Sequence, residues 1–182
     1  KVKVFEVDHP DTQRAKLEKV KKTFGAFPEH VVYVPVDFEK EKLDRRLFES
    51  GYKKDSKTLF IWEAVTEFIT PQAVDETLAF VSNNSGEGSS IVFDYLYKSV
   101  VDGTSQLKCA RESREALARR GEAYKFGLEE GTIRDFLSQR GFLPIEIANW
   151  EFLKNAYFKG KNQNRVVLQW VEYVHAKVKS YE

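Results

Sequence analysis

The chain has 182 residues, of which 42% are apolar and 31% charged, values expected of one globular domain with a buried core. Its 29 basic and 28 acidic residues leave a net charge of +1, which gives no electrostatic reason to expect nucleic acid or a membrane surface as a partner. No apolar run approaches the roughly 18–20 residues of a membrane-spanning helix, and the opening residues lack the pattern of a signal peptide. Because Cys109 is the only cysteine, no internal disulfide can form, and we expect a reducing, cytoplasmic setting.

The first half of the chain alternates strand and helix patterns. Polar and apolar residues alternate up to Val7, and Pro10 suits the first turn of a helix. Thr70 before Pro71 predicts another helix start. The patterns predict strands at 1–7, 30–36, 57–62 and 90–95, and helices at 12–23, 39–50 and from 71. Strands and helices at this spacing predict right-handed crossovers and a mainly parallel sheet.

The second half of the chain is less regular. Residues 97–131 are polar and include a predicted helix at 111–120. Further on, we expect a helix at 132–140 capped by Thr132, a strand at 142–148 with Pro144 at an edge or bulge, a helix at 149–158 and strand-forming residues at 165–178.

Three acidic residues, Asp8, Asp37 and Glu63, follow three successive predicted strands. In an open α/β sheet, ligands bind outside the carboxyl ends of the strands. A carboxylate there can accept both hydroxyls of a ribose, and one on the next strand can accept the amine of adenine, so the pattern is suited to adenosine. Taken singly, each acid is typical of a turn or of a helix start, as with Asp8 before His9 and Pro10.

The sequence also resembles a known family through short motifs that recur in order over nearly the whole chain. They are Phe5-Glu6-Val7-Asp8-His9-Pro10, Val34-Pro35-Val36-Asp37-Phe38, Leu59-Phe60-Ile61-Trp62-Glu63-Ala64-Val65-Thr66, Gly88-Ser89-Ser90-Ile91-Val92-Phe93-Asp94-Tyr95, Phe126-Gly127-Leu128, Phe136-Leu137 and Arg140-Gly141-Phe142. Together they resemble the leucine carboxyl methyltransferase family, in particular its microbial branch of S-adenosylmethionine-dependent methyltransferases.

The resemblance implies a Rossmann-like α/β fold with a mostly parallel sheet and an antiparallel C-terminal strand, and S-adenosyl-L-methionine as the cofactor. It implies that Asp8 holds the ribose, Asp37 the adenine amine and the Phe38 backbone the ring. Glu63 would lie near the methionine or ribose portion of the cofactor.

The family also has an upstream strand and a glycine-rich turn that have no counterpart here. The chain lacks methionine and opens on a strand pattern. We therefore expect residues 1–182 to be the C-terminal portion of a single methyltransferase domain whose N-terminal part is missing, with residues 97–131 as a substrate-covering insertion.

Other patterns argue against other kinds of site. His9, His30 and His175 lie far apart in the sequence, so no metal site is expected. Cys109 is interpreted as an inert residue, and the arginines at 111–120 as a solvated helix face. Tyr95, Tyr97, Tyr124 and Phe126 are candidates for an acceptor pocket, although packing explains each of them singly.

The sequence therefore predicts an O-methyltransferase acting on a small molecule, with a carboxylate among the acceptors. No general base is needed for a carboxylate, which is already ionised at neutral pH. The catalytic residues, the acceptor and the oligomeric state are not predicted. Two alternatives remain open: a non-catalytic domain that keeps the fold, and an NAD-dependent dehydrogenase, which also carries an acid after its second strand.

Overall fold

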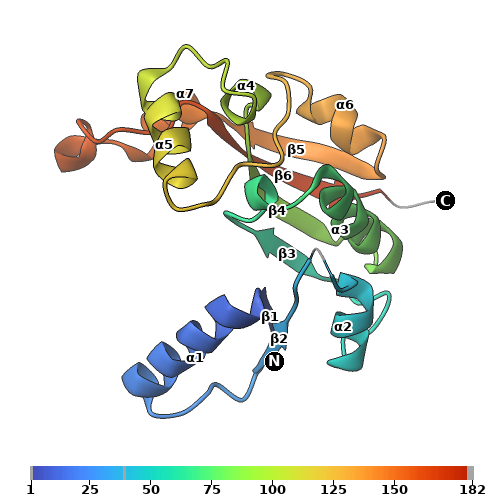
Figure 1. The fold of residues 1–182 in the computed structure, drawn as a ribbon. Coiled ribbons are helices and arrows are strands. Elements are labelled where there is room, and N and C mark those ends of the chain that lie inside the picture. Colours follow the sequence, from blue (N-terminus) through green and yellow to red (C-terminus); the bar gives the residue numbers. More distant parts are fainter. Residues whose placement is uncertain (1, 39, 180–182) are drawn as a thin grey trace. The chain divides into compact units, whose positions relative to one another are not determined.

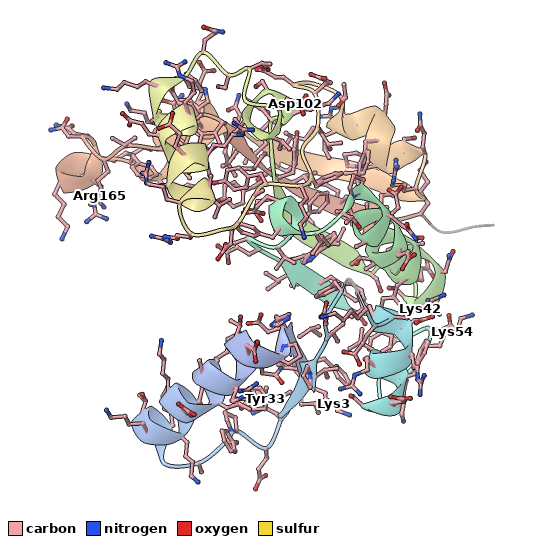
Figure 2. The ribbon with its side chains drawn as sticks, in the orientation of Figure 1. Lys3, Tyr33, Lys42, Lys54, Asp102 and Arg165 are labelled. Carbon is pink, nitrogen blue, oxygen red and sulfur yellow. The ribbon has the colours of Figure 1, made fainter. Side chains whose placement is uncertain are left out.

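The computed structural model describes residues 2–38 and 40–179 (Figure 1), and Figure 2 shows its side chains in the same orientation. The chain divides into two compact units, residues 1–54 and 55–182.

The first unit is a strand–helix–strand crossover followed by a short helix. Its elements are β1 (Val4–Asp8), α1 (Pro10–Phe24), β2 (Val31–Pro35) and α2 (Leu43–Glu49). The strands are parallel and in register, with Val4 opposite Val31 and Asp8 opposite Pro35. Val34 and Val36, which are two residues apart and therefore lie on the same side of the chain, are fully buried.

Helix α1 begins one residue later than an aspartate cap would place it. Asp8 is the last residue of β1, and the N-cap is His9, whose Nδ1 accepts a hydrogen bond from the Asp11 N–H at 3.3 Å. Pro10 occupies the first turn as predicted, and Gly25 ends the helix at φ +77°.

Helix α2 is shorter than the predicted 39–50, and residue 39 lies outside the described residues. The Asp37 carbonyl accepts hydrogen bonds from the N–H groups of Lys40 at 3.0 Å and Glu41 at 2.8 Å, so a turn precedes the helix. Within this helix Leu47 is buried, whereas the adjacent Phe48 is 39% exposed.

The second unit is built on a four-stranded mixed sheet in the order β3-β4-β6-β5. Its strands are β3 (Leu59–Trp62), β4 (Ser90–Leu96), β5 (Phe142–Ala148) and β6 (Val171–Val178). β3 runs parallel to β4, and β6 runs antiparallel to both β4 and β5. This confirms the predicted antiparallel C-terminal strand.

Strand β5 lies at the edge of the sheet, and its register with β6 shifts between Pro144 and Glu146. Proline has no N–H to give to a ladder, so an edge position with an irregularity is where it fits. β6 begins at Val171 and not at 165, because turns and bends occupy residues 163–165 and 169–170.

Helices connect and cover these strands. They are η1 (Thr66–Phe68), α3 (Pro71–Asn84), α4 (Lys98–Val101), α5 (Lys108–Ala118), α6 (Ile133–Ser138), α7 (Trp150–Tyr157) and η2 (Gly160–Asn162). Figure 1 shows α3 beside β3 and β4, and the rings of Phe60 and Phe80 meet edge to face at 6.3 Å. The core of this unit includes Val74, Leu78, Ile91, Phe93, Tyr95, Ile133, Leu137, Phe142 and Val174.

One face of β3 is apolar but not covered. Side chains alternate along a strand, so Phe60 and Trp62 point to the α3 side while Leu59 and Ile61 point to the other. Leu59 is 59% exposed and Ile61 is 72% exposed.

Two threonines that precede helices offer a matched test of capping. Thr70 Oγ1 accepts a hydrogen bond from the Ala73 N–H at 3.2 Å, whereas Thr132 makes no side-chain cap bond and donates to the Glu129 carbonyl instead. We expect Thr70→Ala to lower the free energy of unfolding by about 1 kcal/mol in urea titrations. Thr132→Ala should lower the free energy of unfolding by clearly less. Equal decreases for the two variants would contradict the conclusion that only Thr70 caps its helix through its side chain.

Candidate functional site

Asp8 ends β1, and both of its carboxylate oxygens are engaged within the first unit. Oδ1 accepts from the His9 N–H at 2.8 Å, and Oδ2 lies 2.8 Å from Lys16 Nζ. Lys16 also pairs with Glu6, and its pKa is raised by these two carboxylates against the opposing effect of burial. Lys16 therefore forms ion pairs with the carboxylates of both Glu6 and Asp8 near the end of β1.

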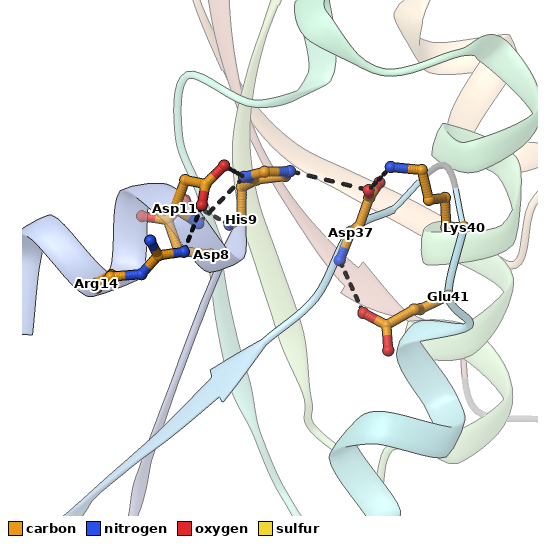
Figure 3. Close-up of polar contacts among 7 residues, drawn as sticks. All are labelled: Asp8, His9, Asp11, Arg14, Asp37, Lys40 and Glu41. Atoms are coloured by element: carbon orange, nitrogen blue, oxygen red, sulfur yellow. Dashed lines mark hydrogen bonds and ion pairs between the residues drawn. The ribbon is translucent and has the colours of Figure 1, made fainter.

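Asp37 lies two residues beyond the end of β2, next to the end of β1 (Figure 3). Val36 N–H donates to the Asp8 carbonyl at 2.9 Å, which continues the strand pairing to this point. His9 Nε2 lies 3.8 Å from Asp37 Oδ2, and Lys40 Nζ lies 2.7 Å from the same oxygen. Phe38 follows directly and is half-buried.

Asp8 and Asp37 thus lie at the same carboxyl edge of one parallel pair of strands. Their side chains are 25% and 17% exposed, so both carboxylates remain within reach of a ligand. The placement that the sequence predicted for these two acids is present, while their contacts with a ligand stay a prediction.

Glu63 belongs to the second unit, at the carboxyl end of β3. It is exposed, and Ala64 after it adopts φ +55°, a left-handed conformation that non-glycine residues rarely take. The Ala64 N–H donates to Asp94 Oδ1 at 2.8 Å, and Thr66 Oγ1 donates to the Asp94 carbonyl at 2.7 Å. These two bonds from β4 fix the turn that carries Glu63.

A second carboxyl in this turn, Glu67, was not among the predicted site residues. It is 8% exposed, and its Oε2 has no hydrogen-bond partner among the described residues. Burial raises the pKa of Glu67, and the charge of Asp94 raises it further. The pKa of Asp94 is also raised, first by burial and then by Glu63.

Tyr173 of β6 stands opposite Asp94 in the strand register. Burial raises the pKa of its hydroxyl, and so do the charges of Asp94, Glu63 and Glu67. Three carboxyls, those of Asp94, Glu63 and Glu67, thus act electrostatically on one tyrosine hydroxyl. One sequence signal could have pointed to Glu67, namely an acid in a short segment that also holds the apolar residues Val65, Phe68 and Ile69.

Two of the aromatic residues predicted for an acceptor pocket have a structural role. The hydroxyls of Tyr95 and Tyr97 both donate to the carboxylate of Glu172, the latter at 2.9 Å, and all three residues are at least nine-tenths buried. Burial raises the pKa of both tyrosines, and the hydrogen bond to Glu172 raises it further. This cluster ties the end of β4 to the start of β6.

The other two aromatic candidates, which lie in the 97–131 region, pack against side chains from inside and outside that region. Tyr124 Oη lies 3.0 Å from Ser113 Oγ of α5, and its ring meets that of Phe68 at 5.8 Å. Phe126 is buried against Phe136 at 5.9 Å.

A surface hollow of about 470 Å³ lies between α3 and the turn into β5, lined by Asp75, Ala79, Ser82, Asn83, Gln139, Arg140 and Gly141. This is the amino end of β5, opposite the edge that carries Glu63 and Asp94. Residues 2–38 and 40–179 contain no cluster of three or more side chains suited to a metal ion. In the same described part of the chain, no helix has the length and apolar character needed to cross a bilayer.

Comparison with known proteins agrees with the predicted resemblance. The model of the leucine carboxyl methyltransferase family matches residues 1–82. YktD of Bacillus subtilis (strain 168), named as a putative S-adenosyl-L-methionine-dependent methyltransferase, is 28% identical over 175 residues, which cover 96% of this chain and 57% of that protein. The chain thus spans less than two thirds of this curated relative.

Solved structures establish the fold. An S-adenosylmethionine-dependent methyltransferase from Mesorhizobium loti matches with a TM-score of 0.61 and 14% identity, over 96% of this chain and 80% of the other. Magnesium protoporphyrin IX methyltransferase from Synechocystis PCC 6803, solved with bound S-adenosylhomocysteine, matches with a TM-score of 0.53 and 10% identity, over 98% and 64%. The predicted Rossmann-like methyltransferase fold is confirmed.

The buried cluster of Glu172 allows a test of its structural role. Glu172→Gln replaces one accepting oxygen by an NH2 group that can only donate, so one tyrosine O–H loses its acceptor. We expect the free energy of unfolding to fall by about 1–3 kcal/mol in urea titrations. Glu146→Gln, on the exposed part of β5, is the control and should change it by less than about 0.5 kcal/mol. Equal effects would contradict the role of the cluster.

The raised pKa of Glu67 makes stability depend on pH. Between the ordinary glutamate pKa of about 4.3 and the raised folded value, the folded chain holds more protons than the unfolded chain, so stability falls as pH rises. Glu67→Gln cannot ionise and should be more stable than the wild-type chain at pH 8, with the difference shrinking toward pH 4. Denaturant titrations across this range measure it, with the exposed Glu87→Gln as control. A difference that does not change with pH would refute this assignment.

Proposed function

We propose that this chain is the C-terminal part of an S-adenosylmethionine-dependent methyltransferase that transfers a methyl group to an oxygen of a small-molecule acceptor. The observation that carries the proposal is the placement of Asp8 and Asp37 at the carboxyl edge of two parallel strands, with His9 next to Asp8 in the chain and 3.8 Å from Asp37. The family match over residues 1–82 covers both of these acids. The named relative and the solved structures of the same fold support it further.

The first unit would bind the adenosine part of the cofactor. Asp8 would accept the two ribose hydroxyls, and Asp37 would accept the adenine amine while the Phe38 backbone meets the ring. An ionised carboxylate suits both tasks because it offers two accepting oxygens. Lys16 Nζ and the His9 N–H, which hold Asp8 in place, would orient its carboxylate toward the ligand.

Glu63 would contact the methionine or ribose portion of the cofactor. Asp94 accepts hydrogen bonds from the Ala64 N–H and the Thr66 hydroxyl, and these bonds hold the turn in its left-handed conformation. The backbone at Glu63 is therefore fixed before a ligand binds. When bound, the cofactor supplies a methyl group on a positively charged sulfur. The residues of the chain would hold and align the acceptor, which can account for much of the acceleration.

Residues upstream of Lys1 would complete the domain. The exposed Leu59 and Ile61 support this, because an apolar strand face normally packs against another layer. We place the strand and glycine-rich turn of the family in that upstream segment. Residues 97–131, with α4 and α5, would help to cover the acceptor.

The acceptor would be a small molecule, and neither nucleic acid nor a membrane is proposed as a partner. Carboxylates are the acceptor class that the family resemblance implies. The two rival functions are a domain that keeps the fold without turnover and an NAD-dependent dehydrogenase. The family match and the fold of the methyltransferase relatives favour the proposal over the dehydrogenase.

Cofactor binding tests the proposal directly. Calorimetry should show that the full-length protein binds S-adenosylhomocysteine and not NADH. Asp8→Ala and Asp37→Ala should each weaken this binding by roughly 10- to 100-fold, as expected for the loss of hydrogen bonds to a charged group. Asp11→Ala is the matched control, because Asp11 lies in the same segment, 73% exposed and paired with Arg14.

Unchanged affinity in both site variants would refute the site. Binding of NADH in place of S-adenosylhomocysteine would favour the dehydrogenase. Cofactor binding without methyl transfer to any acid or phenol would favour the non-catalytic domain.

A further inference from the structure

The last residue of β3 and the turn that follows it contain the two buried side-chain polar atoms of the described residues that have no hydrogen-bond partner. They are Glu67 Oε2 and Trp62 Nε1, and each of these residues is 8% exposed. An unpartnered buried carboxyl oxygen costs on the order of 1–3 kcal/mol or more, so a fold rarely retains one without a use.

Glu67 belongs to the turn at the carboxyl end of β3, which hydrogen bonds from Ala64 and Thr66 to Asp94 of β4 hold in place. The charge of Asp94 adds to the effect of burial in raising the pKa of Glu67, and the charges of both acids and of Glu63 raise the pKa of Tyr173. The carboxyl ends of β3 and β4 are where an open α/β sheet places its ligands. Glu67 also lies only four residues from Glu63, which is proposed for the cofactor.

Charged and titratable groups around Glu67 come from several elements. Asp94 lies on β4, Tyr173 on β6 and Glu63 in the same turn, while the backbone N–H of Lys125 donates to the Glu67 carbonyl at 2.7 Å. Two of these groups are carboxyls, on Asp94 and Glu63. A carboxylate acceptor would meet repulsion here, whereas a neutral hydroxyl would find an accepting oxygen.

We propose that Glu67 is a catalytic base that binds the hydroxyl of the methyl acceptor, so that the acceptor is an alcohol or phenol and not a carboxylate. This inference rests on the proposed methyltransferase function. The hydroxyl proton passes to Glu67 Oε2 while the acceptor oxygen forms its bond to the methyl carbon. The carbon–sulfur bond breaks, its electron pair stays on sulfur, and the products are a methyl ether, S-adenosylhomocysteine and protonated Glu67.

The electrostatics of Glu67 suit this task. Burial and the neighbouring Asp94 raise its pKa, and a base works best when its pKa lies close to the working pH. Asp94 would act as a positioning residue, since its bond to the Ala64 N–H fixes the turn.

The experiment compares wild-type full-length protein with Glu67→Gln and with Glu87→Gln as control. A panel of phenols and the matching benzoic acids serves as acceptors across pH 5 to 9. The wild-type kcat/KM for phenols should rise with pH through the raised pKa of Glu67. Glu67→Gln should lose this dependence and about 10²–10⁴-fold in kcat, while binding S-adenosylhomocysteine normally.

A second readout is independent of turnover. Phenols at saturating concentration, with S-adenosylhomocysteine present, should raise the melting temperature of the wild-type protein and of Glu87→Gln, and should raise that of Glu67→Gln less. Methylation of benzoic acids alone would overturn the inference. A pH profile or phenol-induced shift that Glu67→Gln leaves unchanged would overturn it too, as would cofactor binding with no phenol methylated. Failure to bind the cofactor would instead overturn the proposed function.

Discussion

The carboxylate of Asp94 holds together the part of the molecule on which the candidate chemistry depends. It accepts the N–H of Ala64, a residue at φ +55°, and the carbonyl of Asp94 accepts the hydroxyl of the buried Thr66. Left-handed backbone at a non-glycine residue costs on the order of 1 kcal/mol or more, and persists where surrounding contacts fix it. Because Glu63 and Glu67 flank these two anchored residues, the positions of both carboxyls follow from hydrogen bonds made by β4.

Three buried acids in the second unit differ in the hydrogen bonds that their carboxyl groups receive. Glu172 receives two tyrosine hydroxyls, and Asp94 receives a backbone N–H. Glu67 keeps one oxygen without a partner among the described residues. The cost of desolvation is of similar order for all three, so the difference lies in what compensates it. A structural explanation suffices for Glu172, whose bonds join two strands, whereas Glu67 gains no such contact from its orphan oxygen.

The sequence predicted much of the fold, because its signals there are local. Alternating residues marked the strands, proline and threonine marked the starts of α1 and α3, and Pro144 marked an irregular edge strand. The cap at His9, the shorter α2 and the exposed Phe48 depend on turn geometry that periodicity does not encode. The Glu172 cluster joins residues more than 70 positions apart, and Glu67 meets Asp94 and Tyr173 only after the strands are paired. Both groups therefore required the register of β4 with β6.

The pairing of β4 with β6 also bears on which class of methyl acceptor the chain can bind. The sequence alone is compatible with a carboxylate acceptor, which needs no general base. In the folded chain, burial and the charges of Asp94, Glu63 and Glu67 raise the pKa of Tyr173, and the turn that carries the two glutamates is hydrogen-bonded to Asp94 of β4. At an effective dielectric constant of about 20, two like charges about 4 Å apart repel by roughly 4 kcal/mol, nearly a thousandfold in affinity. A neutral hydroxyl avoids that repulsion and needs the proton acceptor that Glu67 provides, so the same acids that disfavour one acceptor class favour the other.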